Sequence, residues 1–70
     1  MDETLKALRA NKENLETRNG ETWGIVYLDN AKADLKMSGA QFAGYLSALK
    51  AKGLYVSFDD GIFGSVKMGD

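Results

Sequence analysis

Apolar residues in the first part of the chain recur with the spacing of a helix. The stripe consists of three leucines separated by charged and polar residues: Leu5, Leu8 and Leu15. Asp2 is a good N-cap residue, and the pair Asn19-Gly20 is a typical helix stop. The pattern therefore predicts an amphipathic helix over residues 2–18.

The next segment, Trp23 to Leu28, has two interpretations. Its Trp, Ile, Val and Tyr residues favour a strand by propensity. On a helical wheel, however, one broad arc is apolar, formed by Trp23, Val26, Tyr27, Leu28 and Ala31. We favour a helix capped by Thr22, on this arc and on a resemblance described below, with the strand as the open alternative.

Residues 38–52 carry the clearest helical signal in the chain. Ser38 followed by Gln41 forms a capping box. The apolar stripe behind it is continuous, with Phe42, Tyr45, Leu46 and Leu49. Gly53 is placed to end the helix in the left-handed conformation, with Leu54 folding back onto the stripe.

Residues 54–68 predict a β-hairpin with an Asp-Gly tip, for which two registers compete. A two-residue turn would pair Phe58 with Phe63 and mix polar and apolar residues on both faces. A three-residue loop, with Gly61 in the left-handed conformation, pairs Phe58 with Ile62. We favour this loop, because it separates the faces. The inner face would carry Leu54, Val56, Phe58, Ile62, Val66 and Met68, and the outer face Tyr55, Ser57, Phe63, Ser65 and Lys67.

Together these elements predict an α+β fold of two or three helices with a C-terminal β-hairpin, and an extended stretch from Leu35 to Met37. The chain has 70 residues and no Pro/Ser-rich linker. This is too short for two hydrophobic cores, so we expect residues 1–70 to form a single domain.

The helix YLSALKAKGL (Tyr45–Leu54) and the hairpin YVSFDDGIFGSVKM (Tyr55–Met68) resemble the last helix and the wing of a winged-helix domain. The resemblance covers roughly residues 22–68 and implies a winged-helix-like topology and DNA binding. The stretch Phe42 to Lys67 also resembles short uncharacterised proteins of bacteriophages and mobile elements, a likeness that implies no activity.

The residues expected to read DNA depart from that pattern. A recognition helix presents Arg, Lys, Asn or Gln to the base edges. Here the candidates for nucleic-acid contact are sparse: Gln41, Lys50, Lys52 and Lys67. With 9 basic and 10 acidic residues the net charge is -1, so the chain as a whole does not attract a phosphate backbone. We expect any DNA binding to be weak and sensitive to salt.

The face of the 38–52 helix opposite its apolar stripe is made of small residues, Ala40, Gly44, Ser47 and Ala51. The first helix could pack closely across this face, which is the interpretation we favour, or the face could dock a partner helix or a second copy of the chain. Tyr55 and Phe63 would be neighbours on the outer hairpin face, where they either contact a partner or are covered by another segment.

Composition excludes several kinds of chemistry. The chain has no Cys and no His, so it can form no disulfide and no ordinary zinc, copper or haem site. The adjacent Asp59 and Asp60 are better explained as turn formers than as metal ligands. No nucleophile or phosphate-binding motif is present, so we expect no enzymatic activity, no cofactor and no small-molecule substrate.

The longest apolar run, Ile25 to Leu28, is far shorter than a membrane span, and no signal-peptide pattern is visible. We therefore expect a cytoplasmic protein with no membrane association. The leading hypothesis is a non-enzymatic protein-interaction module, associated with a phage or mobile element, that binds a protein partner or itself. The alternative is a weak winged-helix DNA-binding protein.

Overall fold

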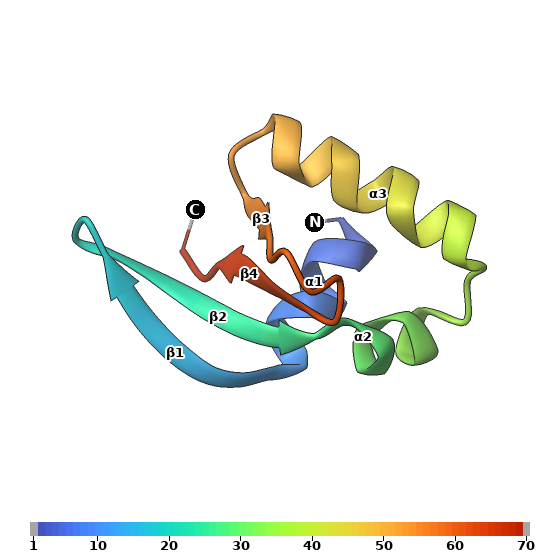
Figure 1. Ribbon diagram of the computed structural model, residues 1–70, viewed down its shortest axis with the longest axis horizontal. Coiled ribbons are helices and arrows are strands. Elements are labelled where there is room, and N and C mark those ends of the chain that lie inside the picture. Colours follow the sequence, from blue (N-terminus) through green and yellow to red (C-terminus); the bar gives the residue numbers. More distant parts are fainter. Residues whose placement is uncertain (1, 70) are drawn as a thin grey trace.

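The computed structural model describes residues 2–69 and confirms the α+β class (Figure 1). Its elements in chain order are α1 (Glu3–Ala10), β1 (Lys12–Arg18), β2 (Glu21–Tyr27), α2 (Leu28–Leu35), α3 (Gly39–Ala51), β3 (Tyr55–Ser57) and β4 (Phe63–Lys67). The four strands form one antiparallel sheet in the order β1-β2-β4-β3. None of the helices within residues 2–69 is long and apolar enough to cross a membrane.

The predicted ends of α3 are confirmed. The Ser38 hydroxyl accepts a hydrogen bond from the Gln41 amide at 3.2 Å, and the Gln41 side chain accepts one from the Ser38 amide at 3.1 Å. At the other end Gly53 has φ +75°, and the Leu54 amide donates to the Leu49 carbonyl at 3.0 Å. Both ends of α3 are therefore closed by the local chemistry that the sequence predicts.

The predicted helix over residues 2–18 is wrong beyond Ala10. Asp2 caps α1 as expected, since its Oδ1 accepts a hydrogen bond from the Thr4 amide at 2.7 Å. The helix ends where the Asn11 side chain donates to the Ala7 carbonyl at 2.8 Å and so satisfies one of the last carbonyls. The chain then continues as strand β1.

The favoured helix for Trp23 to Leu28 is also wrong, because this segment lies mostly in strand β2. Asn19 and Gly20, with φ +50° and +77°, form the two-residue turn that joins β1 to β2. An Asn-Gly pair adopts this turn readily because both central residues need positive φ. The pair therefore ends no helix here, and it instead forms the turn that leads into the second strand of a hairpin.

The segment before α3 also differs from expectation. The sequence predicts an extended conformation at Leu35, whereas in the structure Leu35 is the last residue of α2. The turn out of the helix is made at Lys36, which has φ +53°, and Met37 follows outside any helix or strand. The predicted extended stretch from Leu35 to Met37 therefore does not form.

The favoured register of the C-terminal hairpin is wrong by one residue. Tyr55 pairs with Val66, and Ser57 pairs with Gly64, which is the register of the rejected alternative. A five-residue loop over residues 58–62 connects the strands, and the Asp60 carboxylate accepts hydrogen bonds within it. A slip of one residue exchanges the two faces of a strand. Tyr55 is therefore buried at 2% exposure, whereas the expected inner residues Val56, Phe58 and Ile62 are exposed.

The two registers differ in the faces of β3 and not in those of β4. Val66 faces the helices in both registers, and its pairing with Gly24 of β2 agrees with that orientation. The Tyr55 ring then occupies the space above Gly64, where there is no side chain to obstruct it. The register that forms thus places Tyr55 opposite Val66, on the buried face of the hairpin.

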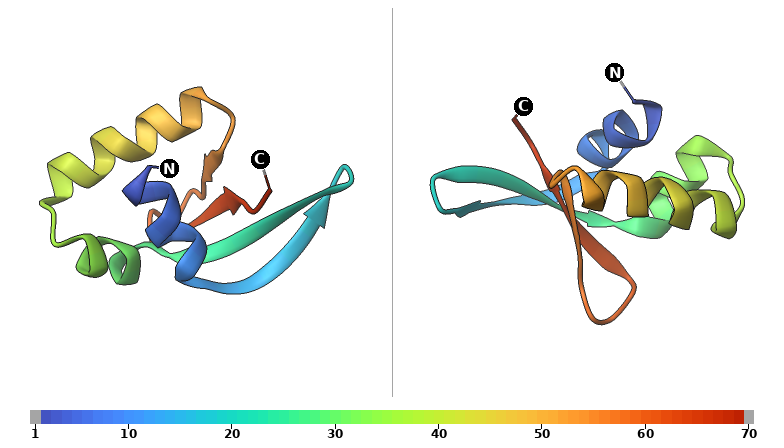
Figure 2. Two further views of the ribbon diagram at one scale, coloured as in Figure 1. Left: turned by 180° about the vertical axis from the view of Figure 1, so that it is seen from behind. Right: turned by 90° about the horizontal axis from the view of Figure 1, so that it is seen from above.

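One core joins all three helices to one face of the sheet (Figure 2). Its buried members are Leu5 and Leu8 of α1, Ala31 of α2, Phe42 and Leu49 of α3, and Val26, Tyr55 and Val66 of the sheet. Because these sheet residues share one face, the alternate residues of β2, β3 and β4 point away from the helices. That second face is called the outer sheet face below.

Candidate interaction surface

The small-residue face of α3 is open to solvent. Ala40, Gly44, Ser47 and Ala51 are all exposed, and a Cβ added at Gly44 would meet no atom within 4 Å. The expectation that the first helix packs across this face is therefore wrong. The reason is that α1 has only eight residues, and its leucines are buried in the core between the sheet and the apolar stripe of α3.

The exposed part of α3 has little charge. Ten of its thirteen residues are exposed, and among these ten only Lys50 is charged. Tyr45, at 47% exposure, is the largest apolar side chain on the helix surface. Solvated helix faces are normally charged or strongly polar. This one presents alanine, glycine and serine instead, so a second surface could approach its backbone closely.

The two aromatic residues expected on the outer hairpin face are separated by the sheet. Tyr55 lies in the core, where burial raises the pKa of its hydroxyl while a hydrogen bond with Ser57 acts in the opposite direction. Phe63 lies on the outer sheet face, with its ring centroid 5.5 Å from that of Tyr27. Tyr55 is therefore removed from the candidate contact surface, and Phe63 belongs to a different one from α3.

The structure does not gather the four candidate nucleic-acid residues into one patch. The Gln41 side chain is engaged in the N-terminal cap of α3, whereas Lys50 and Lys52 are exposed at the other end of that helix. Lys67 lies on the outer sheet face, where its Nζ is 2.6 Å from a Glu21 carboxylate oxygen. No continuous basic surface results from these four side chains.

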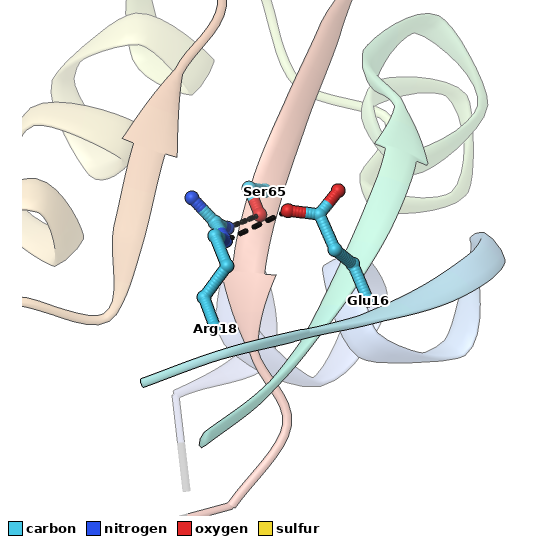
Figure 3. Close-up of polar contacts among 3 residues, drawn as sticks. All are labelled: Glu16, Arg18 and Ser65. Carbon is cyan, nitrogen blue, oxygen red and sulfur yellow. Dashed lines mark hydrogen bonds and ion pairs between the residues drawn. The ribbon is translucent and has the colours of Figure 1, made fainter. Parts of the chain in front are cut away.

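The outer sheet face contains a polar and aromatic cluster that the sequence did not predict. The Arg18 guanidinium donates a hydrogen bond to the buried Ser65 hydroxyl and lies 3.0 Å from a Glu16 carboxylate oxygen (Figure 3). It also lies 4.7 Å from the ring centroid of Trp23. Trp23 is 8% exposed although it lies outside the main core. The alternation of Trp23, Ile25 and Tyr27 was the signal for this face, and it is visible only when the segment is treated as a strand.

Within residues 2–69 no pocket is found, and no group of three or more His, Cys, Asp or Glu residues could hold a metal ion. No protein family, curated protein or solved structure matches this chain.

Proposed function

We propose that this chain is a non-enzymatic protein-interaction module that contacts its partner, or a second copy of itself, through the exposed face of α3. The observation that carries the proposal is the exposure of Ala40, Gly44, Ser47 and Ala51 on a helix that has one charged residue on its surface. Burying such a face desolvates few polar groups and fixes few flexible side chains, so contact with a complementary surface costs little.

The proposal includes a cytoplasmic location and an association with a phage or mobile element. The cysteine-free composition supports the first, and the resemblance of residues 42–67 to short proteins of such elements supports the second.

The experiment is an affinity capture from cells that naturally contain the protein, with three baits run in parallel. Gly44→Arg places a long charged side chain on the α3 face without a clash inside the domain. Ala33→Arg makes the same kind of change at an exposed position of α2. The proposal expects proteins that are retained by wild type and Ala33→Arg but lost with Gly44→Arg, or a self-association that shows the same pattern. Capture that is identical for all three baits contradicts it.

Weak DNA binding is retained as a second candidate because α3 is followed directly by the β3–β4 hairpin, the arrangement that the winged-helix resemblance implies. Against it, the hairpin loop carries Asp59 and Asp60, which would repel phosphates. The candidate predicts that a fluorescent duplex changes its anisotropy at low salt and loses this change steeply as salt rises. An anisotropy that stays constant at low salt with folded protein in excess excludes it.

A further inference from the structure

Five apolar side chains form what is here called the outer sheet patch, four on the outer sheet face and one in the loop that follows β3: Ile25, Tyr27, Val56, Phe63 and Phe58. The strand pairing places Tyr27 beside Phe63, and it places Ile25 and Val56 on either side of Ser65. The Arg18 guanidinium donates to the Ser65 hydroxyl and so lies between Ile25 and Val56. Phe58 is the first residue of the loop that follows β3. Val56 is 40% exposed and Phe58 is 36% exposed, and the other three side chains are half-buried.

None of the helices described within residues 2–69 covers this patch. The three helices share a core with the opposite face of the sheet, and the tip of the β3–β4 hairpin projects from the body of the molecule on the side away from α1 (Figure 2). When one face of an antiparallel sheet faces water, its side chains are usually polar. This patch instead has three aromatic and two branched aliphatic side chains. Its composition therefore indicates that a binding partner covers it.

The charge around the patch is unbalanced at one end. Asp59 and Asp60 occupy the loop beside Phe58 and Phe63, and the Asp60 carboxylate accepts a hydrogen bond from the Phe63 amide at 3.2 Å. Asp29 lies near the same end, 3.5 Å from the Tyr27 hydroxyl. All three carboxylates are exposed, and the ion pairs found within residues 2–69 involve none of them.

The remaining charged residues of the outer sheet face are matched in pairs. Arg18 pairs with Glu16, and Lys67 pairs with Glu21. The local excess around the patch is therefore negative, and a complementary partner would supply positive charge beside an apolar surface.

The width of the patch fits one helix. Three neighbouring strands, β2, β4 and β3, span two strand spacings, or about 10 Å, which is close to the diameter of an α-helix with its side chains. A stable dimer of this chain would need to bury about 800 Å² on each copy, close to a fifth of its surface of 4313 Å². Five side chains of which three are already half-buried do not provide that area.

We infer that the outer sheet patch binds an amphipathic helix of a partner protein, with the apolar face of the helix on the patch and its Lys or Arg residues beside Asp29, Asp59 and Asp60. The inference rests on the proposed function, because it assigns the same module a second contact surface and a partner chemistry. It predicts a three-layer arrangement in which the sheet is covered on both faces by helices.

The test is a titration of the ¹⁵N-labelled full chain with a synthetic helical peptide of leucine and lysine, followed by amide chemical shifts. The matched control peptide has every lysine replaced by glutamate. The inference predicts saturable shifts at the amides of β2, β3 and β4 around the patch with the basic peptide and no saturable shifts with the acidic one. Shifts centred on α3, absent shifts, or equal affinity for both peptides would overturn it.

Two variants and one control separate the apolar and electrostatic contributions. Val56→Thr combined with Phe58→Thr places a β-branched polar residue at both positions and should weaken binding of the basic peptide by about tenfold or more. Asp59→Asn should weaken binding of the basic peptide by a smaller factor, and it leaves the Asp60 hydrogen bonds of the loop unchanged. Leu15→Thr removes an apolar side chain that is 57% exposed on β1, outside the patch, and should bind as wild type does.

If the double variant fails to give a dispersed spectrum, the Asp59→Asn comparison decides the question alone, and unchanged affinity in that variant overturns the inference. Concentration-dependent shifts at the patch without peptide would identify a second copy as the occupant and would also overturn it. Failure here leaves the proposed function intact if the captured proteins are still lost with Gly44→Arg. If Gly44→Arg has no effect on capture while the basic peptide still binds, the α3 face is excluded as a contact surface and the outer sheet patch is retained.

Discussion

The substitution Gly64→Ala adds one methyl group and tests how closely the Tyr55 ring packs on β4 in the β3–β4 hairpin. A Cβ at Gly64 would lie 2.5 Å from Cε1 and 2.6 Å from Cζ of Tyr55, and closer still to its hydroxyl oxygen. The Tyr55 ring is 2% exposed and cannot swing into solvent, so the strand or the ring must move within a packed core. We expect a loss of about 2 kcal/mol or more in the free energy of unfolding.

For a domain of this length such a loss corresponds to a decrease of about 8–16 °C in Tm. The measurement is urea unfolding followed by circular dichroism and by the fluorescence of Trp23. Gly44→Ala is the matched control, since the same methyl group meets no atom within 4 Å in the exposed interior of α3. It should stabilise the chain by about 0.5–1 kcal/mol through helix propensity.

The steric origin of the effect is checked in a second background. In a Tyr55→Leu chain the ring is absent, so Gly64→Ala should cost at least about 1 kcal/mol less than in wild type. If Gly64→Ala is instead neutral in the wild-type chain, the Tyr55 ring does not cover Gly64. The register in which Tyr55 faces outward would then be the correct one.

Three further predictions concern the core, the first hairpin and the titration of a buried phenol. Leu49→Ala truncates a core side chain that is 1% exposed, and it should lower the free energy of unfolding in urea by about 2–5 kcal/mol. A loss as small as that of a surface substitution would show that Leu49 is not central to the core. Gly20 has φ +77°, a conformation that alanine adopts only with strain. Gly20→Ala should therefore lower the free energy of unfolding by about 1 kcal/mol in the same urea curves. An unchanged midpoint would argue against the Asn-Gly turn. Burial raises the pKa of Tyr55 above its ordinary value of about 10, so the unfolded chain loses this proton first and stability falls as pH rises above that value. Tyr55→Phe should remove that part of the alkaline decline, and identical alkaline slopes in the two chains would contradict it.

The sequence predicts the local structure of this chain well where one signal has one meaning. The capping box at Ser38 and the terminal Gly53 of α3 each serve only a helix end, and both are confirmed. The Asn19-Gly20 pair is ambiguous, because it ends helices and also turns hairpins. Strand β1 is exposed along almost its whole length and so lacks the apolar alternation that would have identified it.

The register of the last hairpin was not accessible from its own residues. It depends on how β3 packs against the rest of the core, where Tyr55 is 2% exposed and its ring lies over Gly64. The candidate surface shows the same dependence on distant structure. The residues of the α3 face were predicted correctly, but their exposure follows from the short length of α1, which the sequence pattern overestimated.

The most direct test of the central claim measures whether the α3 face is open in the isolated chain. The protein has no cysteine, so Ser47→Cys introduces one thiol that replaces a hydroxyl of similar size on that face. We predict that this thiol reacts with a disulfide reagent as fast as it does in the urea-unfolded chain, whereas the thiol of Leu49→Cys is strongly protected. Protection of Ser47→Cys in the dilute, monomeric protein would show that another segment covers the face and would contradict the account.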